Sequence, residues 1–319
     1  MGRFVAPATL LAAALLAVVA SAAPRRRPVV LMHGMAQTAA ALGSLQGWIE
    51  ADFPDIHVLN VALSTNASDP WAGIIDSVIV SMNDQVDAFA AAVRADPLLA
   101  DGFDVVGFSQ GALVARGYLE RYNSPRAHNY VSLGGPHQGV YGAPGLNDWC
   151  PDPRCPWVAA LIEQVAVQGP FEPLFQSLVS FAQYWKDPMN LTAYYHTSGF
   201  LADANNEKPG AANPAYKRNF LNTTGNYTFV GASQDGTIVP KESAVWGFFR
   251  PGNDTDLLPA QATRAWTEDL LGLRTAAEAG RVVLAMANCT HGGLVTAACK
   301  AEVYAHYVRP NVGGYLPLR

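Results

Sequence analysis

Hydrophobic and polar residues along the chain follow two alternating patterns. Short apolar runs rich in β-branched residues have the length of buried strands, and they alternate with segments whose apolar residues recur at helical intervals. The expected strands are Val29–Met32, Ile56–Leu63, Phe103–Val106, Tyr130–Leu133, Tyr227–Val230 and Val282–Ala287. The expected helices are Ala39–Asp52, Ile79–Ala95, Ala112–Tyr122 and Leu294–Val308, with a turn opened by Asp69-Pro70. This order predicts an α/β domain with a mostly parallel, doubly wound sheet and helices on both faces.

The alternation of strands and helices stops between about Tyr141 and Asn226. This span contains Cys150, Cys155 and an aromatic-rich tract, Trp157–Tyr195, whose pattern favours helices. Because the strand pattern resumes after it, we interpret residues 141–226 as a largely helical insertion in a single domain that covers residues 24–319. Length alone allows one or two domains.

The first 23 residues differ in character from the rest. Arg3 precedes an apolar run, Leu10–Ala20, which ends in small residues up to Ala23. This order predicts a secretory signal peptide over residues 1–23, cleaved near Ala22 or Ala23. The alternative is an uncleaved anchor, although the run is shorter than the roughly 20 residues that a spanning helix needs. We therefore expect a secretory-pathway protein whose mature chain has no stable membrane span.

Glycosylation motifs and cysteines agree with secretion. Six Asn-x-Ser/Thr sequons are glycosylation candidates: Asn66, Asn190, Asn222, Asn226, Asn253 and Asn288. The four cysteines form two local pairs, and in an oxidising compartment the simplest interpretation is two short-loop disulfides, Cys150–Cys155 and Cys289–Cys299. Four reduced, buried thiols are the alternative. A zinc site is not expected, because the cysteine spacings are wrong and no histidine pair accompanies them.

Composition and charge narrow the function classes. Half of the 319 residues are hydrophobic and 15% are charged, which is typical of a globular protein. The formal net charge of −5, without a cluster of basic residues in the folded part, argues against nucleic-acid binding. The sequence gives no indication of oligomeric state.

One motif carries specific chemistry. Gly107-Phe108-Ser109-Gln110-Gly111 has the form G-x-S-x-G, and it lies between an expected strand and an expected helix. In that context the serine occupies a sharp turn with its hydroxyl exposed above the end of the sheet, as a nucleophile requires. The motif alone is frequent by chance, and a buried turn serine is the alternative interpretation.

A nucleophilic serine needs a histidine as base and a carboxylate that orients the histidine. In the α/β-hydrolase arrangement these groups come in the order Ser, Asp/Glu, His along the chain, and each follows a strand. His291 is the histidine that fits best as the base, because it lies in a loop just after Val282–Ala287. Asp235 follows the strand that ends at Val230 and is the best acid. The backbone N–H groups of Gln110 and Met35 are the expected oxyanion donors.

At these residues the chain resembles the lysosomal type 1 palmitoyl-protein thioesterases, from about Pro28 to Pro317. Several of the matching stretches have no catalytic role, which makes the resemblance specific. The stretches are His33–Met35, Gly107–Gly111, Gly134–Gly142, Ala182–Pro188, Phe200–Asp203, Trp246–Arg250 and Asp269–Leu273.

The resemblance implies an α/β-hydrolase fold and a cofactor-free enzyme that removes long-chain acyl groups from cysteine thioesters of proteins or peptides in lysosomes. Together with the predicted signal peptide, the expected location is the lysosome or outside the cell. It places the nucleophile on Ser109, the acid on Asp235 and the base on His291, with oxyanion donors at Met35 and Gln110. It also matches Cys150/Cys155 to a family disulfide and the insertion to the acyl groove. Cys289/Cys299 and the glycines after His291 depart from the family pattern.

The sequence is compatible with two other functions. The same triad cleaves oxygen esters, so a secreted lipase or carboxylesterase is the main alternative. A non-catalytic binding protein with a hydrolase fold is the second, and a complete Ser/Asp/His set in the expected order argues against it.

Overall fold

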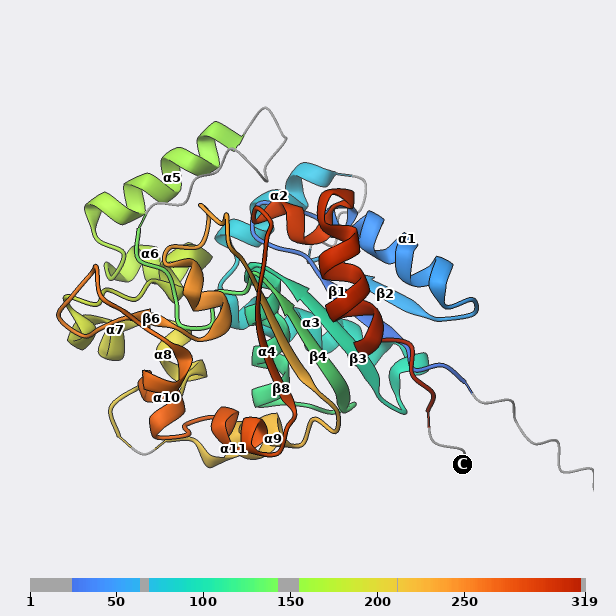
Figure 1. The fold of residues 1–319 in the computed structure, drawn as a ribbon. Helices are drawn as coiled ribbons and strands as arrows, with labels where there is room; N and C mark the ends of the chain where they lie inside the picture. Colours follow the sequence, from blue (N-terminus) through green and yellow to red (C-terminus); the bar gives the residue numbers. More distant parts are fainter. Residues whose placement is uncertain (1–24, 64–68, 143–154, 211, 317–319) are drawn as a thin grey trace, which may run out of the picture.

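The computed structural model describes residues 25–63, 69–142, 155–210 and 212–316. The predicted signal peptide, Asn66 and Cys150 lie outside these residues. Six parallel strands form the central sheet in the order β2-β1-β3-β4-β5-β8 (Figure 1). Their bounds are β1 (Val29–Met32), β2 (Val58–Val61), β3 (Phe103–Phe108), β4 (Ala127–Leu133), β5 (Tyr227–Ala232) and β8 (Val282–Ala287). All six lie within or overlap the strands expected from the apolar runs.

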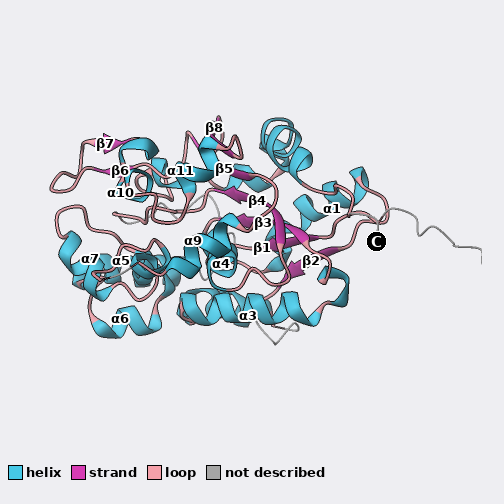
Figure 2. Cartoon of the chain, turned by 90° about the horizontal axis from the view of Figure 1, so that it is seen from below, coloured by secondary structure: helices cyan, strands magenta, loops and turns pink. Residues whose placement is uncertain are grey.

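Helices cover both faces of the sheet, as the alternating pattern predicted. One face packs against α3 (Met82–Ala95) and α4 (Gln110–Arg121), whose buried residues join those of β1 and β3 in one core. The other face packs against α1 (Gly43–Asp52) and the C-terminal helix Lys300–Val308, through residues such as Leu45 and Tyr304. Figure 2 shows α3 and α4 on one side of the strands and α1 on the other. The chain therefore has the doubly wound α/β-hydrolase fold.

The insertion is helical and lies at one end of the sheet (Figure 1). Its helices are α5 (Cys155–Gln168), α6 (Pro173–Leu178), α7 (Leu191–Thr197), α8 (Leu201–Ala204) and α9 (Pro214–Leu221). Phe181, Tyr194 and Phe200 are buried and belong to the same core as α3 and α4. Trp157, Leu174 and Leu178, in contrast, expose half or more of their surface. The insertion thus has both a buried face and exposed apolar side chains.

Two expected elements differ from those observed. A helix, α2 (Pro70–Ile79), occupies the segment where a turn was predicted; Asp69 caps it by accepting a hydrogen bond from Trp71 N–H at 3.0 Å. An aspartate cap followed by proline at the first helical position is a helix-start signal. The predicted helix from Leu294 is instead a series of short 3₁₀ turns followed by a helix of the wider π type over Lys300–Val308.

Besides two 3₁₀ turns, Lys241–Val245 and Ala260–Ala262, four small elements between β5 and β8 were not predicted. They are β6 (Phe248–Phe249), β7 (Leu257–Leu258), α10 (Arg264–Thr267) and α11 (Leu273–Glu278). Each is too short to produce a hydrophobic period that a sequence pattern reveals.

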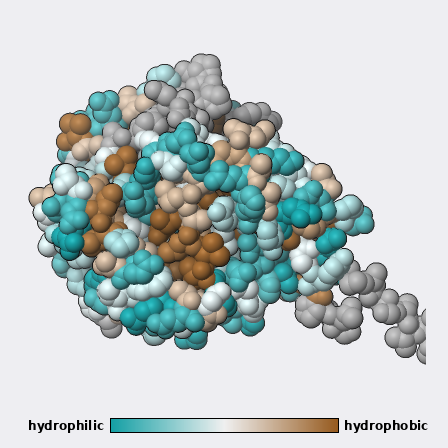
Figure 3. Space-filling view, viewed as in Figure 1, coloured by the Kyte–Doolittle hydropathy of each residue, from teal (hydrophilic) through white to brown (hydrophobic). Residues whose placement is uncertain are grey.

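Strand β8 forms one edge of the sheet and pairs only with β5 among the described strands. Val283 and Met286 on this strand expose 42% and 39% of their surface. An apolar patch lies over β8 in the space-filling view (Figure 3). A cavity of about 270 Å³ beside it is lined by β8 residues and by the segment around Pro259. Among the described residues, no helix is long and apolar enough to cross a bilayer.

A carboxylic acid is buried at the amino end of β3. The carboxylate of Asp104 accepts hydrogen bonds from Arg27 at 3.3 Å and from the side chain of Asn129 at 3.0 Å, and it is fully buried. Burial raises the pKa of Asp104 to about 7, against the opposing effect of Arg27. At a pH between the two pKa values, Asp104 is therefore protonated in the folded protein and ionised in the unfolded chain.

The raised pKa of Asp104 predicts how the stability of the protein depends on pH. Because the pKa of Asp104 is raised on folding, its contribution to stability is fully present below the unfolded pKa and is lost as the pH rises through about 7. The unfolding free energy of the parent protein should therefore fall by on the order of 2 kcal/mol between pH 5 and pH 7.5 because of Asp104. Asp104→Asn should remove this fall. Urea unfolding of both proteins at the two pH values measures this. An unchanged pH dependence in the variant would contradict it.

Candidate active site

Ser109 occupies the sharp turn between β3 and α4. Its backbone has φ of 54° and ψ of −127°, a strained left-handed conformation for a residue with a side chain. A Cβ at Gly111 would lie 2.2 Å from the carbonyl oxygen of His33, so only glycine fits where α4 approaches the end of β1. Ser109 N–H donates to the carbonyl of Leu133 on the neighbouring strand at 2.8 Å. The motif predicted from the sequence thus has the strand, turn and helix context that it requires.

His291 and Asp235 lie beside Ser109. The ring Nε2 of His291 is 3.0 Å from Ser109 Oγ, and its Nδ1 is 2.7 Å from Asp235 Oδ2. A carboxylate only accepts, so Nδ1–H donates to Asp235, and Nε2 is left to accept the hydroxyl proton of Ser109. The structure therefore brings together the three residues selected from the sequence, although Asp235 and Ser109 lie 56 and 182 positions before His291 in the chain.

Asp235 and His291 are held firmly and are shielded from water. The side chains of Asp235 and His291 expose 0% and 2% of their surface. Asp235 Oδ1 accepts hydrogen bonds from the backbone N–H groups of Thr237 at 2.8 Å and Ile238 at 2.9 Å. The ring of His291 packs on Phe108 with 5.0 Å between ring centroids. With both carboxylate oxygens engaged, Asp235 fixes the orientation of the imidazole.

Sequence reasoning did not single out Gly134 as part of the site. It follows β4 with φ of +64°, and a Cβ there would lie 2.9 Å from Cε1 of His291. Two consecutive glycines directly after a buried strand, Gly134-Gly135, are a sign of a close backbone approach that the sequence contained. Gly134 makes room for the histidine ring.

The loop after β1 adjoins Ser109. A Cβ at Gly34 would lie 3.0 Å from Ser109 Cβ, so this loop and the serine are in direct contact. Within the described residues, no protein group accepts a hydrogen bond from the backbone N–H of Met35 or Gln110. Both residues are buried, and both remain the predicted oxyanion donors.

His33, in the same loop, has a structural environment. It is buried, and its Nδ1 lies 2.9 Å from the carbonyl of Gly34. Burial lowers the pKa of His33 to about 4, against the opposing effect of that hydrogen bond, so the ring is neutral near neutral pH. A neutral ring bonded to its own loop fits the interpretation that His33 shapes the loop.

A disulfide closes the loop that contains His291. Cys289 and Cys299 are bonded, as predicted, and the ring that they close contains His291. A Cβ at Gly293 would lie 3.3 Å from Cys299 Sγ, so this glycine packs directly on the disulfide. The side chains of the other predicted disulfide, Cys150–Cys155, lie outside the described part of the chain.

We expect the double variant Cys289→Ser/Cys299→Ser to lose about 2–3 kcal/mol of unfolding free energy, because the bond restricts the unfolded chain. We also expect kcat to fall severalfold, because the loop that positions His291 becomes less constrained. Urea unfolding and steady-state kinetics, each with and without reductant, measure both effects. Reductant should destabilise the parent protein more than the double variant, in which the predicted Cys150–Cys155 bond is left to reduce. A double variant as stable as the parent would contradict the role given to this bond.

The sequons differ in exposure. Asn190, Asn222, Asn226 and Asn288 are exposed, and Asn253 is partly buried. Asn288 directly precedes the disulfide-closed loop that contains His291, and its Oδ1 accepts a hydrogen bond from the side chain of Gln234 at 2.9 Å. All of these remain glycosylation candidates.

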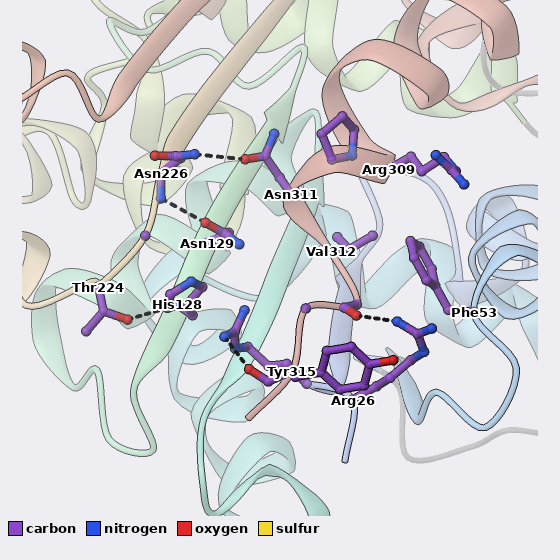
Figure 4. A pocket seen from close by; sticks show the side chains of 15 residues that line it. Arg26, Phe53, His128, Asn129, Thr224, Asn226, Arg309, Asn311, Val312 and Tyr315 are labelled. Carbon is purple, nitrogen blue, oxygen red and sulfur yellow. Dashed lines mark hydrogen bonds between the residues drawn. The ribbon is translucent and has the colours of Figure 1, made fainter. Parts of the chain in front are cut away.

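A cavity of about 660 Å³ lies at the amino ends of the strands, opposite the end that holds Ser109. Its lining is polar, with side chains from the starts of β4 and β5 and from the C-terminal segment (Figure 4). Asn226 donates to Asn311 Oδ1 at 3.4 Å across it, and Arg26 donates to the carbonyl of Gly313 at 2.9 Å. Its position and polarity do not suit an acyl chain bound at Ser109. Among the described residues, no three His, Cys, Asp or Glu side chains are arranged to hold a metal ion.

Comparison with solved structures gives weak likenesses. Aspergillus fumigatus lipase B aligns with a TM-score of 0.45 and 13% identity, over 91% of this chain and 54% of that chain.

Comparison with known sequences gives strong matches. The model of the family described as palmitoyl protein thioesterase matches residues 28–291. Palmitoyl-protein thioesterase 3 of Dictyostelium discoideum is 40% identical over 83% of this chain and 85% of its own length. Palmitoyl-protein thioesterase 1 of Caenorhabditis elegans is 35% identical over 82% and 84%, and lysosomal thioesterase PPT2 of Bos taurus is 27% identical over 85% and 84%. The chain therefore belongs to the palmitoyl protein thioesterase family and is a thioester hydrolase.

Proposed function

We propose that the protein removes long-chain fatty acyl groups, such as palmitate, from cysteine thioesters of proteins or peptides through a covalent acyl-serine intermediate. The observation that carries this proposal is the continuous chain of contacts from Ser109 Oγ to His291 (3.0 Å) and from His291 to Asp235 (2.7 Å). Such a relay turns a serine hydroxyl into a nucleophile. Family membership supports the thioester as the bond that is cleaved.

The reaction proceeds in two acyl transfers. In the first, His291 Nε2 takes the proton of Ser109 as Oγ bonds to the thioester carbonyl carbon, and the negative charge on the carbonyl oxygen is stabilised by the N–H groups of Met35 and Gln110. The carbon–sulfur bond then breaks, and the leaving thiolate receives the proton from His291. In the second, His291 activates water, which releases the fatty acid and restores Ser109. A thiol with pKa about 8.5 needs less protonation than an alcohol to leave.

The acyl chain needs an apolar surface near Ser109. Segment 180–184 of the insertion reaches the residue next to the nucleophile, since Tyr184 OH lies 3.1 Å from Gln110 Oε1. Trp157, Leu174 and Leu178 of the same insertion expose apolar surface. Each buried CH₂ of a fatty acyl chain contributes about 0.8 kcal/mol, so a long chain gains most from such a groove. The contact of Tyr184 with Gln110 and the exposed apolar side chains of the insertion support its assignment as the acyl groove.

We further propose that the protein acts in the secretory pathway, in the lysosome or outside the cell. The relatives named lysosomal thioesterases support this, together with the Cys289–Cys299 disulfide, since disulfides persist in oxidising compartments.

A fluorophosphonate probe tests the serine mechanism. The probe is expected to modify Ser109 alone, as located by peptide mass spectrometry, and a palmitoyl thioester should slow the labelling. Ser177→Ala, which removes an exposed hydroxyl from α6, should label like the parent protein, and Ser109→Ala should not label. Failure to label the parent protein would favour a non-catalytic binding protein instead.

A further inference from the structure

The side chain of Gln110, the residue after the nucleophile, is fully hydrogen-bonded in the interior. It exposes 2% of its surface. Its Nε2 donates to the carbonyl of Ser77 at 2.7 Å and to Gln85 Oε1 at 3.0 Å. Its Oε1 accepts from Tyr184 OH at 3.1 Å, and Ser180 Oγ lies 2.9 Å from it. Both donor positions of the amide are therefore used, and Oε1 accepts from Tyr184; the single proton of Ser180 Oγ is shared between Oε1 and the carbonyl of Ser77, which lies 3.0 Å away.

The same cluster reaches the loop that contains Met35. The backbone N–H of Ala36 donates to Ser77 Oγ at 2.8 Å, and Tyr184 OH lies 3.7 Å from Met35 Sδ. Tyr184 therefore contacts both residues whose N–H groups are the predicted oxyanion donors. The hydroxyl has one proton, and the amide oxygen of Gln110 is nearer and a stronger acceptor than the thioether sulfur.

Tyr184 is suited to a fixed, neutral contact. It exposes 4% of its surface, and burial raises its pKa, so the hydroxyl stays protonated as a donor. Its ring packs against Phe181 with 5.6 Å between ring centroids. Both residues belong to the insertion, whereas Gln110 begins α4. The hydroxyl of Tyr184 therefore joins the insertion to the residue beside the nucleophile.

We propose that Tyr184 is a positioning residue for the oxyanion hole. Its hydroxyl holds the Gln110 side chain, and so keeps the Gln110 N–H aimed at the oxygen that becomes negative in the transition state. Through this contact, the insertion shapes the reacting centre as well as the acyl groove. This inference rests on the proposed function, because it assigns a role within that reaction.

Tyr184→Phe tests the inference, since it removes the hydroxyl and keeps the packed ring. We expect kcat on a palmitoyl-cysteine peptide to fall about tenfold, with KM within twofold of the parent value. Complete loss of one oxyanion donor lowers kcat about 10²- to 10³-fold, so a misaimed donor loses part of that. Tyr216→Phe is the matched control: it removes a hydroxyl that donates to Asp203 at 2.8 Å inside the same insertion, and its kcat should be unchanged.

An inhibitor comparison separates positioning from general loosening. A long-chain acyl trifluoromethyl ketone forms a tetrahedral adduct that needs the oxyanion hole, whereas palmitate needs only the groove. In Tyr184→Phe the ketone should bind about tenfold more weakly, and palmitate should bind as it does to the parent protein. If Tyr184→Phe does not fold, Ser180→Ala, which alters a second donor beside the same oxygen of Gln110, is measured in its place.

Two results would overturn the inference. One is unchanged kcat and unchanged ketone affinity in a folded Tyr184→Phe protein. The other is an equal loss of affinity for ketone and palmitate, which would show that the hydroxyl only supports the insertion. A parent protein that cleaves the matched oxygen ester and not the thioester would instead contradict the proposed substrate, and the Tyr184→Phe comparison would then be made on the ester.

Discussion

Replacing Ser109 by alanine is expected to lower kcat for acyl-thioester hydrolysis by about 10⁴- to 10⁶-fold, because no other group in the described site can form the acyl intermediate. Asp235→Asn should lower kcat by about 10⁴-fold, because an amide can hold His291 in the tautomer that cannot accept the serine proton. Steady-state kinetics on a palmitoyl-cysteine peptide measure both effects.

The controls for this prediction address folding. Ser109 is held in a strained conformation, and the only hydrogen bond of its hydroxyl within the described residues is to His291, so Ser109→Ala should unfold at or slightly above the parent temperature. Ser177→Ala should keep full activity. Residual activity above about 1% in a folded Ser109→Ala protein would show that another nucleophile does the chemistry.

The largest effect on stability is expected from Lys186, which pairs with Glu207 inside the insertion. Lys186 Nζ lies 3.1 Å from both carboxylate oxygens of Glu207 and 3.1 Å from Gln138 Oε1. Tyr194 OH donates to the same carboxylate at 2.7 Å, and the charged side chains are at least 93% buried. We expect Lys186→Met to destabilise the protein by about 3–5 kcal/mol, because it leaves the charge of Glu207 buried and unpaired.

The double variant Lys186→Met/Glu207→Gln separates the pair from the site around it. Removing both charges should recover a substantial part of the lost free energy of unfolding, since the cost lies in the unpaired charge. Urea unfolding of the parent, the two single variants and the double variant measures the coupling. Additive losses in the double variant would show that the two charges do not stabilise each other.

The sequence predicted the sheet and the three central residues of the site for the same physical reason. Parallel strands buried on both faces appear as continuous apolar runs, as in Val29–Met32, and functional groups of such sheets follow the ends of strands. Ser109, Asp235 and His291 each come shortly after such a run, and this placement, together with the order Ser, Asp, His along the chain, was sufficient to select them. Their catalytic roles remain a prediction.

Other features depend on contacts that no local pattern contains. Tyr184 meets Gln110 across 74 positions, and Lys186 meets Gln138 across 48. In the sequence alone, a polar residue that is buried in the fold cannot be distinguished from an exposed one, because its hydrogen-bond partner lies far away along the chain. The resemblance had marked Ala182–Pro188 as a matching stretch without a reason, and the structure gives one: this stretch bonds to Gln110, a predicted oxyanion donor, through Tyr184 and to Glu207 through Lys186. The helix α2 was missed for a different reason, since its Asp-Pro start also fits a turn.

The central claim is that the Ser109 site cleaves long-chain acyl thioesters. The most direct measurement compares kcat/KM for a palmitoyl-cysteine peptide with that for the same peptide carrying palmitoyl-serine, on the parent protein with Ser109→Ala as the blank. We predict that the thioester is preferred by at least tenfold and that Ser109→Ala cleaves neither. A preference for the oxygen ester would contradict this account and identify the protein as an esterase on this fold.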